Sequence, residues 1–92
     1  MNRETKKLLK ECQTYYKSGN VRDAQICYQN VLLTMNETNP SYSNICNDLG
    51  AVYKQSNQLL LAKKYFLLAI KYKKNYIVAH NNLGVVYQEL NL

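Results

Sequence analysis

One heptapeptide occurs twice in the chain, and this repetition constrains the fold more than any other feature. NDLGAVY occupies residues 47–53 and NNLGVVY occupies residues 81–87, so equivalent residues are 34 positions apart. A fixed period of this length indicates a repeat architecture, in which each unit stacks on its neighbours to bury a shared core. At 92 residues, the chain has room for one such domain, which we expect to cover residues 1–92.

Hydrophobic periodicity predicts that the repeated units are helical. Apolar residues recur at steps of three and four, for example Ile45, Leu49 and Val52, which places them on one face of an α-helix. Chain breakers are rare, since Pro40 is the only proline and there are three glycines. The pattern predicts an all-α fold with five helices, near residues 3–18, 21–35, 40–56, 59–73 and 76–90.

A second motif follows the first heptapeptide. Ala62, Phe66 and Ala69 come after Leu49 and Gly50 with the spacing A-x-x-x-F-x-x-A. Together with L-G-x-x-Y this 34-residue pattern resembles the tetratricopeptide repeat (TPR) family, whose unit is a pair of antiparallel helices. The resemblance implies a right-handed α-solenoid with repeats at about 5–38 and 43–76 and a half repeat at 77–92. Its structural motif comprises Leu49, Gly50, Tyr53, Ala62, Phe66, Ala69, Leu83, Gly84 and Tyr87.

The first repeat departs from this pattern. Ala24, Tyr28 and Val31 match the second half of the motif, but Ala24 precedes Ala62 by 38 residues, four more than the period. The surplus falls in NETNPSY, residues 36–42, where a loop or an extra helical turn can absorb it. Cys12 replaces the glycine of the L-G pair.

The position of Gly50 inside a helix needs a physical reason, because glycine there costs about 1 kcal/mol relative to alanine. We expect close approach of the next helix to be that reason, and the small Cys12 meets the same need in repeat one. The cysteines Cys12, Cys27 and Cys46 are odd in number and form no C-x-x-C pair. We therefore predict buried free thiols, with neither a disulfide nor a metal site.

Composition excludes several functional classes. No apolar run approaches the roughly 20 residues that cross a bilayer, and the N-terminus lacks the apolar core of a secretory signal. We therefore predict a soluble, cytoplasmic protein with no membrane partner. No phosphate-binding loop, carboxylate pair or nucleophile motif occurs. The single histidine, His80, has no partner at catalytic spacing, so we expect no enzyme and no cofactor.

The TPR resemblance implies that the first helix of each pair lines a concave groove. Asparagine and glutamine there can hold the backbone of an extended peptide, since their amides both donate and accept. In TPR domains similar to that of O-linked GlcNAc transferase, an asparagine directly before the Leu-Gly pair has this role; Asn82 matches it and Asp48 does so in part. The predicted groove residues are Lys6, Gln13, Tyr16, Lys17, Asn47, Asp48, Lys54, Gln55, Asn81 and Asn82.

Other functions compete with peptide binding. The net charge of +6 includes a cluster at Lys63, Lys64, Lys71, Lys73 and Lys74, but we expect a solvated convex face there and no nucleic-acid partner. The last helix leaves Val85, Leu90 and Leu92 without an obvious cover, which favours association through this helix with another copy as a homo-oligomer, with a partner, or with further repeats of a longer chain. The remaining alternative is that the chain is a TPR fragment of a larger protein, such as the substrate-selecting part of an enzyme.

Overall fold

The computed structural model describes residues 1–91, and five helices form the regular secondary structure of that range. They are α1 (Arg3–Lys17), α2 (Val21–Leu33), α3 (Tyr42–Gln55), α4 (Leu59–Tyr72) and α5 (Ile77–Leu90). The predicted all-α class is confirmed, and every expected boundary lies within two residues of the observed one. Leu92 lies outside the described residues. None of the helices in residues 1–91 has the length and apolar character needed to cross a bilayer.

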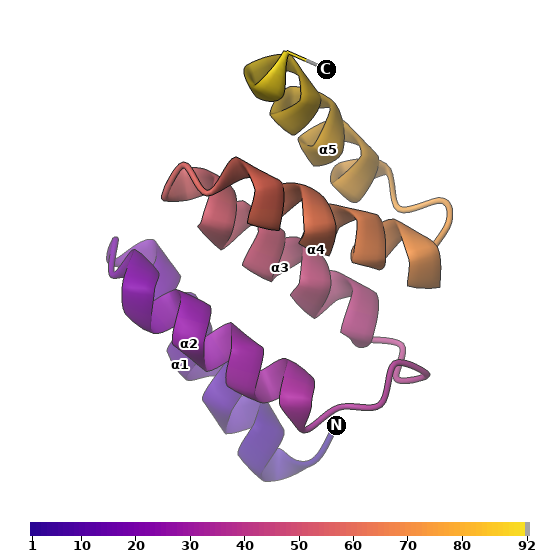
Figure 1. Ribbon diagram of the computed structural model, residues 1–92. Helices are drawn as coiled ribbons and strands as arrows, with labels where there is room; N and C mark the ends of the chain where they lie inside the picture. The colour runs from indigo at the N-terminus through magenta and orange to yellow at the C-terminus, as the bar shows by residue number, and fades with distance from the viewer. Residues whose placement is uncertain (92) are drawn as a thin grey trace.

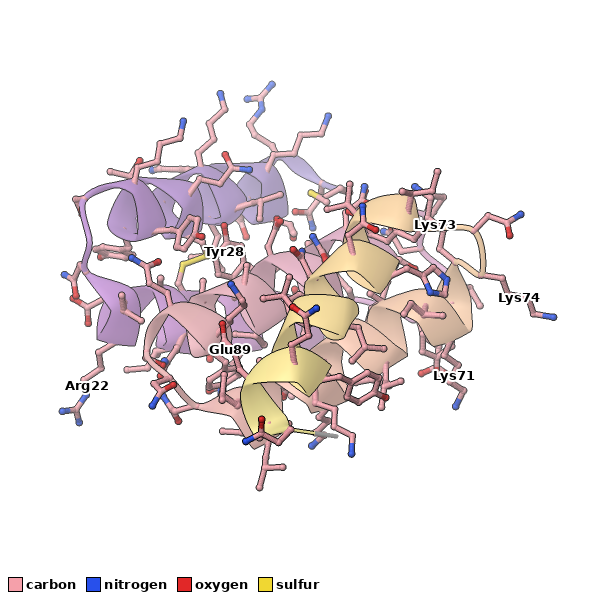
Figure 2. All side chains as sticks on the ribbon, turned by 90° about the horizontal axis from the view of Figure 1, so that it is seen from above. Arg22, Tyr28, Lys71, Lys73, Lys74 and Glu89 are labelled. Atoms are coloured by element: carbon pink, nitrogen blue, oxygen red, sulfur yellow. A yellow bond between two sulfur atoms is a disulfide. The ribbon has the colours of Figure 1, made fainter. Side chains whose placement is uncertain are left out.

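The helices pack in chain order as three tiers (Figure 1). α1 packs on α2, α3 lies between α2 and α4, and α5 packs on α4 while also touching α3. One main core runs through the stack, and Figure 2 shows Tyr28 enclosed by the helices while Arg22 and Lys71 extend from the surface. Its fully buried side chains include Tyr28, Val31, Ile45, Leu49, Val52, Phe66 and Val86.

The turns repeat in the backbone as well as in the sequence. α1 and α3 are each followed by a residue in the left-handed region, Gly19 at φ 81° and Asn57 at φ 62°. After each one, an amide returns to the helix: Asn20 N–H donates to the carbonyl of Tyr15 and Gln58 N–H to that of Tyr53, both at 2.9 Å. The α2–α3 connection is longer, spanning residues 34–41, so a loop absorbs the four surplus residues and α3 begins at Tyr42.

Close helix packing explains Gly50. A Cβ atom at this position would lie 2.7 Å from the ring of Phe66, so the α4 side chain rests directly on the α3 backbone. Ala62 and Ala69 flank Phe66 on α4 and are, like it, fully buried. The expected role of Gly50 is confirmed. Gly84, its equivalent on α5, is open on this side, and within residues 1–91 no atom outside the backbone of α5 itself and the two neighbouring residues would lie within 4 Å of a Cβ at this position.

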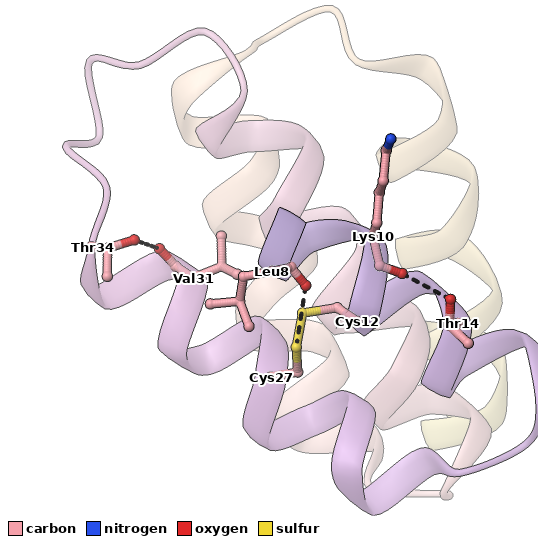
Figure 3. The surroundings of a disulfide bond; sticks show 7 residues. All are labelled: Leu8, Lys10, Cys12, Thr14, Cys27, Val31 and Thr34. Carbon is pink, nitrogen blue, oxygen red and sulfur yellow. Dashed lines mark hydrogen bonds between the residues drawn. A yellow bond between two sulfur atoms is a disulfide. The ribbon is translucent and has the colours of Figure 1, made fainter. Parts of the chain in front are cut away.

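A disulfide links the first helix pair, and here the sequence-based prediction was wrong. Cys12 of α1 is bonded to Cys27 of α2, with 5.3 Å between their Cα atoms (Figure 3). The spacing of 15 residues carried no signal, because the turn at Gly19 alone brings the two helices face to face. Cys12, the small residue that permits close approach of α1 and α2, therefore lies against Cys27. Cys46 is a buried free thiol as predicted, and burial raises its pKa to about 12.

Alanine at Gly50 and at Gly84 should change stability in opposite directions. Gly50→Ala places a methyl group against the Phe66 ring, which we expect to lower the free energy of unfolding by about 1–3 kcal/mol. Gly84→Ala meets only open space, so the gain in helix propensity should raise it by up to about 1 kcal/mol. Urea denaturation of the two variants checks this pair. Shifts of the same sign would contradict the packing explanation.

The disulfide should stabilise the N-terminal helix pair. A bridge closing a loop of this length contributes about 3 kcal/mol through its effect on the unfolded chain. We expect dithiothreitol to lower the urea midpoint of the wild type and to leave the Cys12→Ala/Cys27→Ala variant unchanged. If the reductant has no effect on the wild type, the bridge contributes nothing to stability.

Candidate peptide-binding site on α1, α3 and α5

The predicted groove residues differ widely in exposure. Lys6, Gln13, Lys17, Gln55 and Asn81 are exposed, and Tyr16, Asp48, Lys54 and Asn82 are half-buried. Asn47 alone is buried, with 6% of its surface exposed. The set therefore divides into a solvent-facing group available to a ligand and a central group that first contacts the protein itself.

Asn47 and Asn82 form a link between two of the three first helices. The Nδ2 of Asn82 on α5 donates to the Oδ1 of Asn47 on α3 over 3.1 Å. Asn47 also lies near the Tyr76 hydroxyl, where it opposes the burial-driven rise in the pKa of this tyrosine. The side-chain amides of Asn47 and Asn82, which were expected to hold a peptide, are thus already hydrogen-bonded to each other and link α5 to α3.

Asp48 is the most unusual group in the central part of the site. Burial raises the pKa of its carboxyl to about 6, and no basic side chain within residues 1–91 contributes a lowering. The carboxylate lies close enough to two phenols to raise the pKa of each, although burial of the ring is the larger cause for both. These phenols belong to Tyr28 of α2 and to Tyr76, the residue before α5.

Tyr28 and Tyr76 were not among the predicted site residues. Tyr28 is equivalent to Phe66 of repeat two. Its hydroxyl, which phenylalanine lacks, was the one signal in the sequence that this position could belong to a polar site. Tyr16, which was predicted, also raises the pKa of Tyr28, placing it beside the same group. Tyr28 and Tyr76 thus place phenol groups near one carboxylate, and phenols can hydrogen-bond a ligand but cannot neutralise a charge.

The other side chains with possible metal-binding or acid–base chemistry are the acidic residues, the cysteines and His80. Within residues 1–91, no three His, Cys, Asp or Glu side chains gather closely enough to hold a metal ion. His80 is exposed, and its Nε2 lies 2.8 Å from the carbonyl oxygen of Lys74 in the preceding turn.

The comparisons with known proteins give two relatives whose names state no activity. No protein-family model matches the chain. Over 71 residues it is 32% identical to the "Uncharacterized protein ycf37" of Pyropia yezoensis, which covers 77% of this chain and 35% of that protein. Over 75 residues it is 32% identical to the protein of the same name from Porphyra purpurea, covering 82% and 43%. The chain thus spans less than half the length of these relatives, and its TPR membership and cytoplasmic location stay predictions.

Replacing Asp48 should remove a pH dependence of stability. Because its folded pKa of about 6 lies above the ordinary 3.8, the native state holds the proton more tightly, and stability falls as pH rises from 4 to 7. Asp48→Asn lacks this penalty, so it should be more stable than the wild type at pH 7 by as much as about 3 kcal/mol. At pH 4 the two should converge. Urea denaturation of both proteins at each pH is the measurement, and parallel pH profiles would contradict the burial of the carboxyl.

Proposed function

We propose that this chain is a TPR-like module that binds a peptide along the face formed by α1, α3 and α5, with Asp48 receiving a basic group of the ligand. The half-buried Asp48 carboxyl is the observation that carries the proposal. A carboxylate removed from water without a cation costs free energy that a purely structural residue would not need to bear. Carboxyl groups with strongly shifted pKa values cluster at functional sites.

The proposed ligand gains charge complementarity that the protein alone lacks. A lysine, arginine or terminal amine beside Asp48 would lower the pKa of the carboxyl and keep it ionised at neutral pH. The phenols of Tyr28 and Tyr76 can then donate to the carboxylate, and Tyr16 offers a half-buried ring for the ligand's aliphatic part. Binding should therefore weaken as pH falls below 6, where the carboxyl is protonated.

The exposed residues of this face suit an extended peptide and favour one orientation of that peptide. Gln13, Gln55 and Asn81 carry amides that both donate and accept, as a peptide backbone requires. Lys6 and Lys17 are exposed on α1, so an acidic residue of the ligand would lie toward that helix while its basic group lies at Asp48. A peptide of mixed charge fits this arrangement best.

Asp48→Asn should reduce binding of peptides selected from a random library on the wild-type protein. We expect lysine or arginine in the selected sequences and at least about a tenfold loss of affinity in the variant, because a hydrogen-bonded charge pair is lost. Asp23→Asn is the matched control, since it removes the same charge from an exposed position on α2. Fluorescence anisotropy at pH 7 gives both affinities.

Equal affinities for the two variants would remove Asp48 from the proposed site. An absence of basic residues among the selected peptides would remove the charge assignment as well. Asn47 is unsuited to this test because its buried hydrogen bond to Asn82 makes a loss of stability the expected result of its removal.

A further inference from the structure

α5 repeats α3 in structure as well as in sequence. Ala79, Leu83 and Val86 are buried, as are Ile45, Leu49 and Val52, which precede them by 34 residues. Asn91 follows α5 at φ 60°, as Asn57 follows α3 at φ 62°. α5 therefore has the packing positions and the terminal turn of the first helix of a pair.

The side of α3 that α4 covers is open on α5. Gly50 lies under Phe66, and Cys46 packs with Ala69 of α4. The equivalent residues Gly84 and His80 are exposed on α5. Ile77, equivalent to the 4% exposed Ser43, is 71% exposed. We call Ile77, His80 and Gly84 the open α5 face.

The repeat also indicates what borders this open face. In the pair already formed, Lys64 of α4 lines a hollow with Gln29, Leu32 and Leu33 of α2. The residues 38 positions later are Leu67, Ile70 and Lys71 of α4, so a helix on the open α5 face would have one edge against them.

That edge is positively charged and apolar. Leu67 is 41% exposed, and no acidic residue occurs between Asp48 and Glu89 to offset Lys71 and its neighbouring lysines. Figure 2 shows Lys71 and Glu89 extending to opposite sides of α5, so this acidic residue does not lie at the lysine edge. A helix docked there gains from an acidic side chain facing Lys71.

We propose that the open α5 face docks an amphipathic helix of another protein, which presents an aromatic side chain to Gly84 and an acidic one to Lys71. The aromatic residue is flanked by small residues four before and three after it, as Phe66 is by Ala62 and Ala69. A second copy of this chain has no such helix to offer. The helices that carry the pattern, α2 and α4, already bury Tyr28 and Phe66 in their own pairs.

The probe for this face is a labelled peptide with the sequence of residues 58–73 carrying K64E, which combines the α4 packing pattern with an acidic residue at the edge position. It should bind the wild-type protein, and Gly84→Leu should weaken it by at least about tenfold because the leucine occupies the space of the aromatic ring. Glu89→Leu is the control, since it adds the same side chain to α5 at the position equivalent to the exposed Gln55. It should leave binding unchanged.

Two further peptides keep the test independent of how the variants fold. F66A in the K64E peptide should weaken binding by at least about tenfold, and restoring the lysine should weaken it about fivefold at low salt. Detectable binding that ignores both Gly84→Leu and F66A overturns the proposal, as does absence of binding to the wild type. A wild-type dimer that Gly84→Leu converts to a monomer would also overturn it, by assigning the face to a second copy. None of these outcomes depends on Asp48, so they are separate from those of the peptide-binding test.

Discussion

The contact between the Phe66 ring and the backbone of Gly50 determines how the molecule is built. It brings α3 and α4 closer than any side chain at position 50 would permit, and Ala62 and Ala69 extend the close approach along the same line. Because α3 lies between α2 and α4, its apolar side chains Ile45, Leu49 and Val52 are buried. α3 also carries Asp48 and Asn47, the second of which accepts a hydrogen bond from Asn82 of α5.

Each unit of the chain treats this contact differently. In the first pair the small residue is Cys12, and its disulfide to Cys27 joins α1 and α2 covalently. In repeat two the equivalent residue is Gly50, where α3 and α4 come together by packing alone. The residue equivalent to Phe66 in the first pair is Tyr28, whose hydroxyl lies near Asp48 and so connects the packing of one pair with the polar site of the next. At Gly84 the same small residue is present without a ring to fill the space.

Local and periodic features of the fold were predictable from the sequence, and interactions across helices were not. The five helices follow from apolar spacing, and Gly50 signalled close packing because glycine inside a helix needs compensation. The disulfide depended on which faces the Gly19 turn brings together, which no spacing of cysteines encodes. The hydrogen bond from Asn82 to Asn47 was unpredictable for the same reason. The sequence register of both residues predicts that they face a ligand, but the contact between α5 and α3 joins them to each other. The raised pKa of Asp48 likewise reflects burial, near Tyr28 of α2 and Tyr76 before α5, which lie far from it in the sequence.

The two surfaces of α5 meet different physical demands. Toward α3 and α4 it is held by the buried apolar side chains Leu83 and Val86, and the Asn82–Asn47 hydrogen bond links it to α3, so its position on that side is set before any ligand binds. Away from α3 it exposes Ile77 and Gly84, where helical backbone is accessible and no side chain of the described residues competes for the space. A ligand at Asp48 would interact with polar groups whose arrangement depends on the first of these surfaces. A helix docked at Gly84 would add apolar burial to the second without disturbing the link, so binding at one site need not displace α5 from the other.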